Sequence, residues 1–243
     1  MARAPRIAVF RPDDERLASA VETLESRGAT AIPDPLLSVE PTGNVPTAAT
    51  DMIVLTSKSG VECLTAEGWT PQTATVACIG PTTADRAQEA GWDVDIVPAE
   101  YSSAGLVTAL DDAVAGKDVT VARSDHGSTT LIDGLEAAGA SVSEIVLYRL
   151  TQPAGTGQST VMAAGNQLDA ACFSSSLTIK HFIDTAERRG VRSEAIAGLN
   201  RAIVGAIGNP TCKAAEKYGI RVDVVPESAD FEQLIDLVLN AGP

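Results

Sequence analysis

The sequence predicts an α/β protein with two similar domains, each a parallel β-sheet covered by helices on both faces. Short apolar runs alternate along the chain with stretches in which apolar residues recur every three or four positions. The apolar runs are continuous, which is typical of strands buried on both faces of a parallel sheet. Motifs from the first half of the chain also return in the second half, and this repetition indicates two related domains.

The chain begins with the pattern of a strand followed by a helix. Residues 6–10 form a short apolar run, and the Pro and Asp residues within 11–14 are typical of a helix start. Leu17, Val21 and Leu24 then recur at helical spacing. We therefore expect a first strand at 6–10 and a helix that ends at the following glycine.

The same succession returns through the rest of the chain. Further strands are expected at the apolar runs 52–55, 75–79, 94–97, 119–122, 170–173, 202–207 and 222–225. Helical spacing is found at Val107, Leu110 and Val114, and again at Phe231, Leu234, Ile235 and Val238. Strands that alternate with helices in this way are expected to form parallel sheets.

The internal repetition has fixed offsets. The matching segments are 9–13 and 121–125, then 55–57 and 173–175, then 79–83 and 207–211. Their offsets are 112, 118 and 128 positions, so the second copy has about ten extra residues between its last two segments. We call the segment at 9–13 A, and the segments at 55–57 and 79–83 together B. Their second copies are A′ and B′, so the chain reads A, B, A′, B′. The repeat leaves open whether A shares a sheet with B or with B′.

Composition and charge exclude several classes of partner. The formal net charge of −14 argues against binding of nucleic acid or of an anionic membrane surface. No apolar run approaches the ~20 residues that span a bilayer, and the apolar stretch at 7–10 is too short for a signal peptide. We therefore expect a cytoplasmic protein. The spread acidity suits a salt-rich cytoplasm, as in a halophile, and an ordinary acidic surface is the alternative.

No cofactor or metal site is expected from the sequence. The four cysteines (Cys63, Cys78, Cys172 and Cys212) have no C-x-x-C spacing, and the only histidines are His126 and His181. This pattern indicates reduced thiols that serve as small core residues rather than zinc ligands. The chain also has no G-x-G-x-x-G segment and no P-loop lysine motif, so nucleotide chemistry has no support.

Small polar segments follow six of the expected strands, and each precedes a helix. They are 11–13, 56–60, 80–83, 123–128, 174–176 and 208–211. In parallel sheets this edge binds ligands, and helix N-termini there offer free N–H groups to anions. A Ser or Thr in such a place is often only a helix cap, and Arg11 and Arg123 can be surface residues. The repetition of three loop types in both halves favours a site for a polyanion.

Several of these segments, in their order and spacing, resemble the uroporphyrinogen-III synthase family. They are Ile79-Gly-Pro-Thr-Thr-Ala84 with Gly91 and Val97-Pro98, Leu55-Thr-Ser-Lys-Ser-Gly-Val61, Phe173-Ser-Ser-Ser176 and Val146-Leu-Tyr-Arg149. The resemblance extends over about 7–237. Two positions depart from the family pattern: the segment at 208–211 retains one threonine of the usual two, and Lys58 stands where proline is frequent.

The resemblance implies a fold in which the two domains are discontinuous in sequence. One domain combines residues 1–37 with 154–243, and the other is the central segment 43–148. A two-stranded connector at 38–42 and 149–153 joins them around a cleft.

It also implies an enzyme, a cyclising hydro-lyase of tetrapyrrole (haem, sirohaem, cobalamin) biosynthesis. The substrate is hydroxymethylbilane, a linear tetrapyrrole with eight carboxylates. The enzyme removes its hydroxyl as water and closes the ring to uroporphyrinogen III with ring D inverted, without a cofactor. We expect a monomer that receives its substrate from the preceding, bilane-forming enzyme and binds neither nucleic acid nor membrane. The alternative is a hinge-closing binding module for an anionic small molecule.

Motif matching assigns the site residues. Tyr148 corresponds to the family tyrosine near the departing hydroxyl, although an ordinary cross-strand aromatic is the alternative reading. Substrate carboxylates are expected to be bound by Ser57, Thr82, Thr83, Ser174, Ser175, Thr211, Arg11 and Arg123. No metal ligand is expected.

Overall fold

The structure, a computed structural model, describes residues 3–47 and 49–242. The chain divides into two compact units. The end unit contains both chain ends, up to Ser38 and from Thr151, and the central unit is Val39–Leu150. Within the described residues, no helix is long and apolar enough to cross a membrane. The division falls inside two strands that pair with each other, β3 (Ser38–Pro41) and β7 (Ser141–Thr151).

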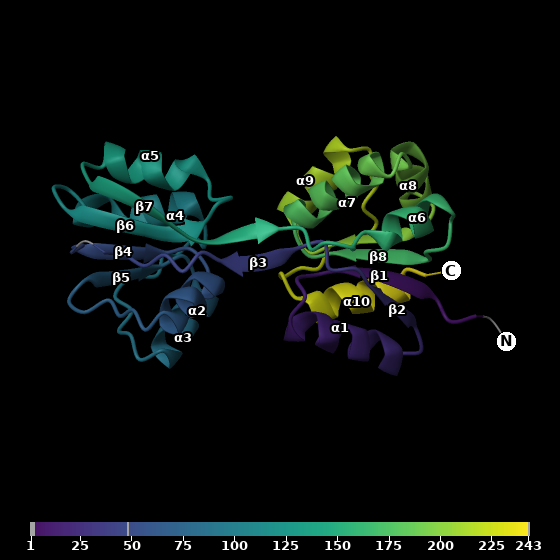
Figure 1. The fold of residues 1–243 in the computed structure, drawn as a ribbon, viewed down its shortest axis with the longest axis horizontal. Coiled ribbons are helices and arrows are strands. Elements are labelled where there is room, and N and C mark those ends of the chain that lie inside the picture. The colour runs from purple at the N-terminus through teal and green to yellow at the C-terminus, as the bar shows by residue number, and fades with distance from the viewer. Residues whose placement is uncertain (1–2, 48, 243) are drawn as a thin grey trace. The chain divides into compact units, whose positions relative to one another are not determined.

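The end unit is a parallel sheet with helices on both faces (Figure 1). Its strands are β1 (Arg6–Phe10), β2 (Thr30–Pro33), β8 (Ala170–Phe173) and β9 (Ile203–Ala206), in the sheet order β2-β1-β8-β9. Its helices are α1 (Glu15–Ser26), α6 (Gln158–Ala164), α7 (Ser176–Arg188), α8 (Arg192–Leu199), α9 (Asn209–Lys217) and α10 (Phe231–Asn240). Apolar residues of α1 and α10 form one core cluster with the sheet, and residues of α6 to α9 form another.

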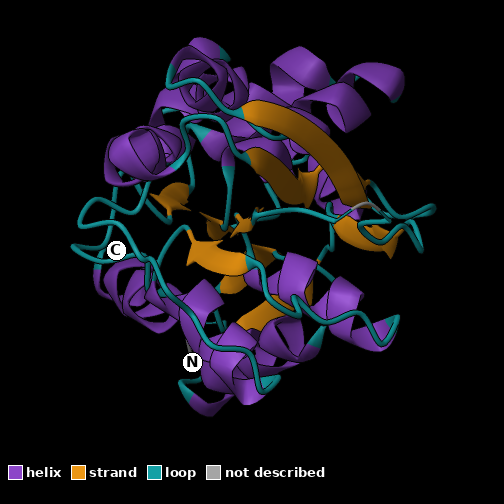
Figure 2. Ribbon diagram, turned by 90° about the vertical axis from the view of Figure 1, so that its left-hand side faces the viewer, coloured by secondary structure: helices purple, strands orange, loops and turns teal. Residues whose placement is uncertain are grey.

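The central unit has the same construction. Its strands are β3, β4 (Met52–Leu55), β5 (Thr75–Cys78), β6 (Asp118–Ser124) and β7, in the sheet order β3-β7-β6-β4-β5. Its helices are α2 (Lys58–Ala66), α3 (Pro81–Glu89), α4 (Ser103–Leu110) and α5 (Thr129–Ala137), with a 3₁₀ turn at Asp111–Ala113. One core cluster lies under α2 and α3, and the other under α4 and α5. Figure 2 shows the strands between layers of helix.

The strand pairing answers the question that the repeat left open. Segment A shares a sheet with B′, because β1 pairs in parallel with β8. Segment A′ shares a sheet with B, because β6 pairs in parallel with β4. The predicted fold class, two similar parallel-sheet α/β domains discontinuous in sequence, is therefore confirmed. The extra residues of the second copy form α8, between β8 and β9.

Two expected strands, 94–97 and 222–225, are reduced to single bridges, so these predictions were wrong. The bridges join Ala77 to Ile96 and, 128 positions later, Gly205 to Val224. In the first, the Asp95 carboxylate accepts the Val76 N–H at 2.8 Å, a donor that a longer ladder would use. In the second, Asp223 accepts the Val204 N–H at 2.9 Å. Two residues after each bridge comes a proline, Pro98 or Pro226, which has no N–H to donate, so the pairing cannot continue in the C-terminal direction.

A buried carboxylate joins the two chain ends within the end unit. Asp34, just after β2, is only 4% exposed. It accepts hydrogen bonds from the backbone N–H of Gly157 at 2.6 Å and of Ser159 at 2.9 Å, at the start of α6. A carboxylate at this place satisfies helix N-terminal donors and the helix dipole together. The start and the end of the chain are therefore held in one unit by charge-assisted bonds as well as by the sheet.

Candidate functional site

The predicted loops lie at the carboxyl edge of each sheet, because all the strands that they follow are parallel to their neighbours. In the end unit, Arg11, Ser174 and Ile207 follow or end β1, β8 and β9. In the central unit, Ser57 follows β4, the Gly80 loop follows β5, and Tyr148 lies near the end of β7. Each unit thus presents its own set of polar groups, and the two sets are described separately.

In the central unit, Tyr148 and Ser57 are in direct contact. The Tyr148 hydroxyl and Ser57 Oγ are hydrogen-bonded to each other at 2.8 Å. Ser57 is also the N-cap of α2, and its Oγ accepts the Gly60 N–H at 3.0 Å. Tyr148 is 6% exposed, whereas Ser57 is only half-buried. Burial raises the pKa of Tyr148, and hydrogen bonds to Ser57 and Ser124 partly oppose that rise.

A β-bulge determines the direction of the Tyr148 side chain. β6 and β7 pair in register up to Arg123 and Val146, but Ser124 then pairs with Tyr148, so Leu147 is an extra residue. Leu147 and Tyr148 consequently both pack in the core cluster under α2 and α3, which consecutive residues of a regular strand cannot do. Bulges of this kind often re-aim a side chain next to an active site.

The bulge carbonyls are satisfied by the segment that follows β3. The Thr42 hydroxyl donates to Val146 O at 2.8 Å and to Leu147 O at 3.0 Å, and the Thr42 N–H donates to Leu147 O at 2.9 Å. The Asn44 side-chain amide adds a bond to Val146 O at 3.1 Å. These bonds hold the irregular stretch of β7 in one conformation, so the Tyr148 hydroxyl has a defined position.

In the end unit, Arg11 borders a pocket of about 740 Å³ at the carboxyl edge. The other lining residues come from strand ends, α1 and the start of α10: Glu15, Arg16, Ser19, Ala20, Thr23, Ser174, Ile207, Ala229, Asp230, Phe231, Glu232 and Ile235. The Arg11 guanidinium lies 4.2 Å from the centre of the Phe231 ring. Its Nε is buried and has no hydrogen-bond partner among the described residues. Burial and the neighbouring Arg16 lower the pKa of Arg11, which stays charged at neutral pH.

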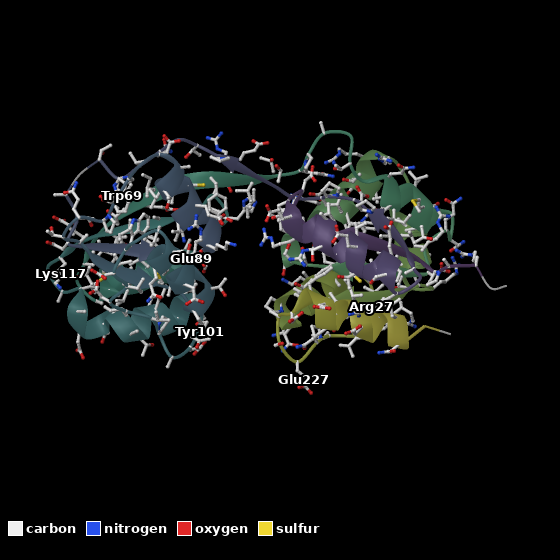
Figure 3. The ribbon with its side chains drawn as sticks, turned by 90° about the horizontal axis from the view of Figure 1, so that it is seen from below. Arg27, Trp69, Glu89, Tyr101, Lys117 and Glu227 are labelled. Carbon is white, nitrogen blue, oxygen red and sulfur yellow. The ribbon has the colours of Figure 1, made fainter. Side chains whose placement is uncertain are left out.

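Helices α1 and α10, which form one wall of this pocket, are also joined by ion pairs. Arg27, after α1, pairs with Glu232 at 3.1 Å and with Asp236. Figure 3 labels Arg27 beside α10. Ser174 is fixed from the sheet side, since its hydroxyl donates to Phe10 O at 2.7 Å. Ser175 is the N-cap of α7 and forms a capping box with Thr178.

The threonines of the two repeated helix starts are buried. Thr83 and Thr211 occupy the third position of α3 and α9 and are 4% and 3% exposed. Thr82, by contrast, is exposed at the second position of α3, where α9 has Pro210 instead. The first residue of α3 is Pro81, which has no N–H, so the N–H of Thr82 is the first free donor at that helix start. In α9 the proline is the second residue, so the first free donor is the N–H of Asn209.

Arg123 is placed differently from Arg11. It is 6% exposed, its Nε donates to Glu144 at 2.6 Å, and its guanidinium also donates to Ser128 O. A Cβ at Gly127 would lie 2.4 Å from the Arg123 side chain, so the loop is closed over it. An arginine engaged in this way holds its own loop, and binding of a substrate carboxylate would require it to leave both partners.

Sequence reasoning missed three residues that shape these sites: Ser124, Thr42 and Phe231. Ser124 touches Tyr148 through the bulge, which no sequence pattern indicated. Phe231 was assigned to the helical stripe of α10, but its ring also carries the Arg11 guanidinium. Over residues 3–47 and 49–242, no group of three or more His, Cys, Asp and Glu side chains is arranged to hold a metal ion.

Comparison with known proteins identifies the family. The family model described as uroporphyrinogen-III synthase HemD matches residues 18–236. The candidate uroporphyrinogen-III synthase of Methanothermobacter thermautotrophicus is 35% identical, over 94% of this chain and 95% of that protein. The uroporphyrinogen-III synthase of Chlorobaculum parvum is 26% identical, over 68% of this chain and 66% of that protein.

Solved structures agree in fold. The uroporphyrinogen III synthase of Thermus thermophilus, a mutant form, covers 98% of both chains with a TM-score of 0.72 at 18% identity. The enzyme of Helicobacter pylori covers 98% of this chain and 99% of its own with a TM-score of 0.64 at 15% identity. With a family model over most of its length and a relative above 30% identity over nearly all of it, the chain belongs to the uroporphyrinogen-III synthase family.

Proposed function

We propose that this chain converts hydroxymethylbilane into uroporphyrinogen III, with loss of water and inversion of ring D. The observation that carries the proposal is the repeated presence of polar strand-end loops at the carboxyl edge of both sheets, in a chain of this family. A substrate with eight carboxylates needs many anion contacts. An acidic protein can supply them through helix N-termini and a few oriented side chains.

In the end unit, Arg11 is the strongest candidate for a carboxylate ligand. Its side chain lines the pocket, where a substrate carboxylate would pair with the guanidinium in a charge-assisted bond. Ser174 borders the same pocket and fixes its sheet edge. In the central unit, Thr82 and Ser57 are the accessible donors. Thr83 and Thr211 are buried and support these loops from within. Ser175 is half-buried and caps α7, as Ser57 caps α2, so it is a further candidate donor in the end unit.

The chemistry asks the protein mainly for control of conformation. Loss of the hydroxyl leaves a cation delocalised over the terminal pyrrole, and the bilane can close without help in the non-inverted sense. The protein therefore has to hold the folded chain in a reactive arrangement and keep water from the cation. The proposal takes the two compact units as the two domains of the enzyme, a monomer at work in the cytoplasm that is supplied by the bilane-forming enzyme.

A coupled assay tests the function. Hydroxymethylbilane is generated fresh by the preceding enzyme, and the type III and type I ring isomers are separated after oxidation to porphyrins. We expect the type III isomer, with activity that survives dialysis and a chelator. Type I isomer alone, formed at the rate seen without the protein, contradicts the proposal. Tight binding of an unchanged bilane would favour the binding module instead.

A further inference from the structure

We propose that Tyr101 binds a pyrrole ring of the substrate by stacking, at the carboxyl edge of the central sheet. The proposal rests on the proposed function. It adds a residue for the apolar part of the bilane, whereas the polar loops bind its carboxylates. It concerns the central unit alone, and it is carried by the exposure of the ring, by the way its loop is held and by a difference between the two copies of the repeat.

Tyr101 lies at the edge of the sheet where the candidate polar loops gather. The bridge between Ala77 and Ile96 is parallel, so the chain after Ile96 leaves the sheet at the same edge as the end of β5. The Tyr101 ring then lies against the backbone of Gly80. A Cβ added to Gly80 would be 3.3 Å from Tyr101 Cγ, which is tighter than ordinary van der Waals contact. Thr82, the accessible donor at the start of α3, follows two residues after Gly80.

The Tyr101 side chain is unusually open to solvent for an aromatic group. It is 64% exposed, the highest value among the large apolar side chains that the structure describes, and Figure 3 labels it. A single exposed apolar side chain is common at protein surfaces, so exposure alone assigns no role. The way in which this ring is held distinguishes it.

The backbone on both sides of Tyr101 is fixed against α4. The Ser102 N–H donates to Glu100 O at 2.8 Å, and the Ser102 hydroxyl donates to the Glu100 carboxylate at 2.8 Å. Ser102 Oγ also accepts the Gly105 N–H at 3.0 Å. Gly105 lets the loop come close, because a Cβ there would lie 1.9 Å from Glu100 O. The ring is therefore presented on a well-held loop, so little conformational freedom is left to lose when a ligand binds.

The end unit has the same loop without the ring. At the offset of 128 positions, Ala229 stands in place of Tyr101. The glycine that the ring covers is kept as Gly208, where an added Cβ would meet only Pro210, at 3.9 Å. Two copies of one fold thus differ at this position, so the shared fold does not require an aromatic ring there. A large ring that folding does not require, beside a candidate binding loop, indicates a role in binding.

Pyrrole rings suit this surface. Hydroxymethylbilane carries its carboxylates on short arms at the ring edges, which leaves the two faces of each pyrrole apolar and electron-rich. An aromatic side chain binds such a face in an offset or edge-on arrangement, while the free N–H and hydroxyl of Thr82 bind a carboxylate at the ring edge. A pyrrole that takes no part in the bond changes is the same before and after water is lost. Tyr101 should therefore affect KM rather than kcat.

The experiment measures KM, kcat, the isomer ratio and the melting temperature of four variants with freshly generated hydroxymethylbilane. We expect Tyr101→Ala to raise KM ~10-fold, with kcat close to that of the parent and type III isomer as the product. Tyr101→Phe should keep the KM of the parent, because it keeps the ring. Tyr101→Leu covers Gly80 without an aromatic face and should behave like Tyr101→Ala. Val97→Ala is the matched control, since Val97 is an apolar side chain of the same segment, 41% exposed, and its loss should leave KM unchanged.

Three results would overturn the assignment. An unchanged KM in Tyr101→Ala means that the ring contacts no substrate. A parent-like KM in Tyr101→Leu, beside a raised KM in Tyr101→Ala, means that the side chain only covers the Gly80 backbone. An equal rise in Tyr101→Phe and Tyr101→Ala means that the hydroxyl binds and the ring does not. A parent protein that makes no type III isomer contradicts the proposed function itself, whereas an active parent with any of these three results contradicts the role of Tyr101 alone.

Discussion

Arg11 carries its charge on a largely apolar support, with its guanidinium 4.2 Å from the Phe231 ring centre and its Nε buried. A cation held over an aromatic ring is stabilised in the free protein, so the side chain is oriented before a ligand arrives. Lysine would keep the charge but not the Nε donor or the planar contact with the ring. The role of the positive charge and the role of the planar guanidinium can therefore be tested separately.

We expect Arg11→Gln to raise KM for hydroxymethylbilane about 10- to 100-fold, the loss typical of a hydrogen bond to a charged group. Arg11→Lys should raise it by a smaller factor. Arg201→Gln is the control, since Arg201 in the same unit is exposed and bonds the neutral Asn166 side chain at 2.8 Å. Steady-state kinetics give the values. Equal KM for Arg11→Gln and the parent would show that Arg11 serves only the packing of α10.

The buried thiols predict how stability depends on alkaline pH. Burial raises the pKa of both Cys78 and Cys172 from 9.0 to about 12. Between these two values the unfolded chain loses thiol protons that the folded protein keeps. The contribution of the two thiols to the unfolding free energy is therefore fully present below pH 9. It is lost as pH rises towards 12, by up to about 1.4 kcal/mol per pH unit for each thiol.

Urea unfolding at pH 7.5, 9 and 10.5 under reducing conditions measures this slope. Cys172→Ala should be less stable at every pH but should lose less stability between pH 9 and 10.5 than the parent. Cys212→Ala is the comparison, because Cys212 is half-buried near the surface and its removal should change the slope less. Parallel curves for Cys172→Ala and the parent would contradict the predicted linkage.

At the residue level, the sequence indicated where polar groups gather but not which of them are free. Arg11 and Arg123 occupy equivalent positions in the repeat, Arg11 directly after β1 and Arg123 near the end of β6, and they look alike in sequence. In the structure Arg123 is engaged by Glu144 and Ser128, whereas Arg11 Nε has no partner in the described part of the chain. The difference depends on side chains brought in from other strands and loops, so it could not be inferred locally. The contacts of every named residue with substrate stay predictions.

At the level of elements, continuous apolar runs were the most informative signal. The strands expected at 52–55 and 170–173 coincide with β4 and β8, because their residues are buried on both faces. The edge strand β2 was missed, since its residues are exposed or half-buried and it ends in Pro33. The bulge in β7 was also missed. It is maintained by Thr42, a residue with no distinctive sequence context.

Thr42 offers a test of the bulge. Thr42→Val keeps the shape of the side chain but removes the bonds to Val146 O and Leu147 O. We expect a loss of about 1 to 2 kcal/mol in unfolding free energy, and a lower kcat with more type I isomer because Tyr148 loses its defined position. Thermal melting and the isomer assay measure both effects.

The matched control for Thr42→Val is Thr50→Val in the same unit. The Thr50 hydroxyl donates to Met52 O at 2.8 Å and to Asp118 O at 2.9 Å, where β4 and β6 begin, at the opposite edge of the sheet from Tyr148. Its loss should lower stability by a similar amount and leave kcat unchanged. If the two variants affect kcat equally, the bulge does not position Tyr148.

At the level of the whole molecule, the repeat predicted two related domains, and strand pairing shows how their halves are exchanged. Equivalent carboxylates recur across the copies: Asp51 accepts the N–H of the first residue of β6, and Asp169 accepts that of β1. Such details follow the offsets of 118 and 112 positions read from the sequence. Whether segment A shares its sheet with B or with B′ could not be read from the offsets, because the local sequence pattern of A fits both equally well.

The net charge of −14 is also a property of the whole molecule, and it predicts how stability depends on salt. Repulsion among acidic side chains destabilises the compact state, and it weakens as the Debye length shrinks from ~10 Å at 0.1 M to ~3 Å at 1 M. The ion pairs at the surface weaken as well, but each contributes little. We therefore expect the melting temperature to rise steadily in potassium chloride from about 0.1 M to above 1 M.

A variant with Glu136→Gln, Glu187→Gln and Glu227→Gln, three exposed positions, changes the net charge from −14 to −11 and should show a smaller rise. A melting temperature that stays flat or falls with salt in the parent would contradict the halophile interpretation, and an identical rise in the variant would assign the effect to salting-out of apolar surface.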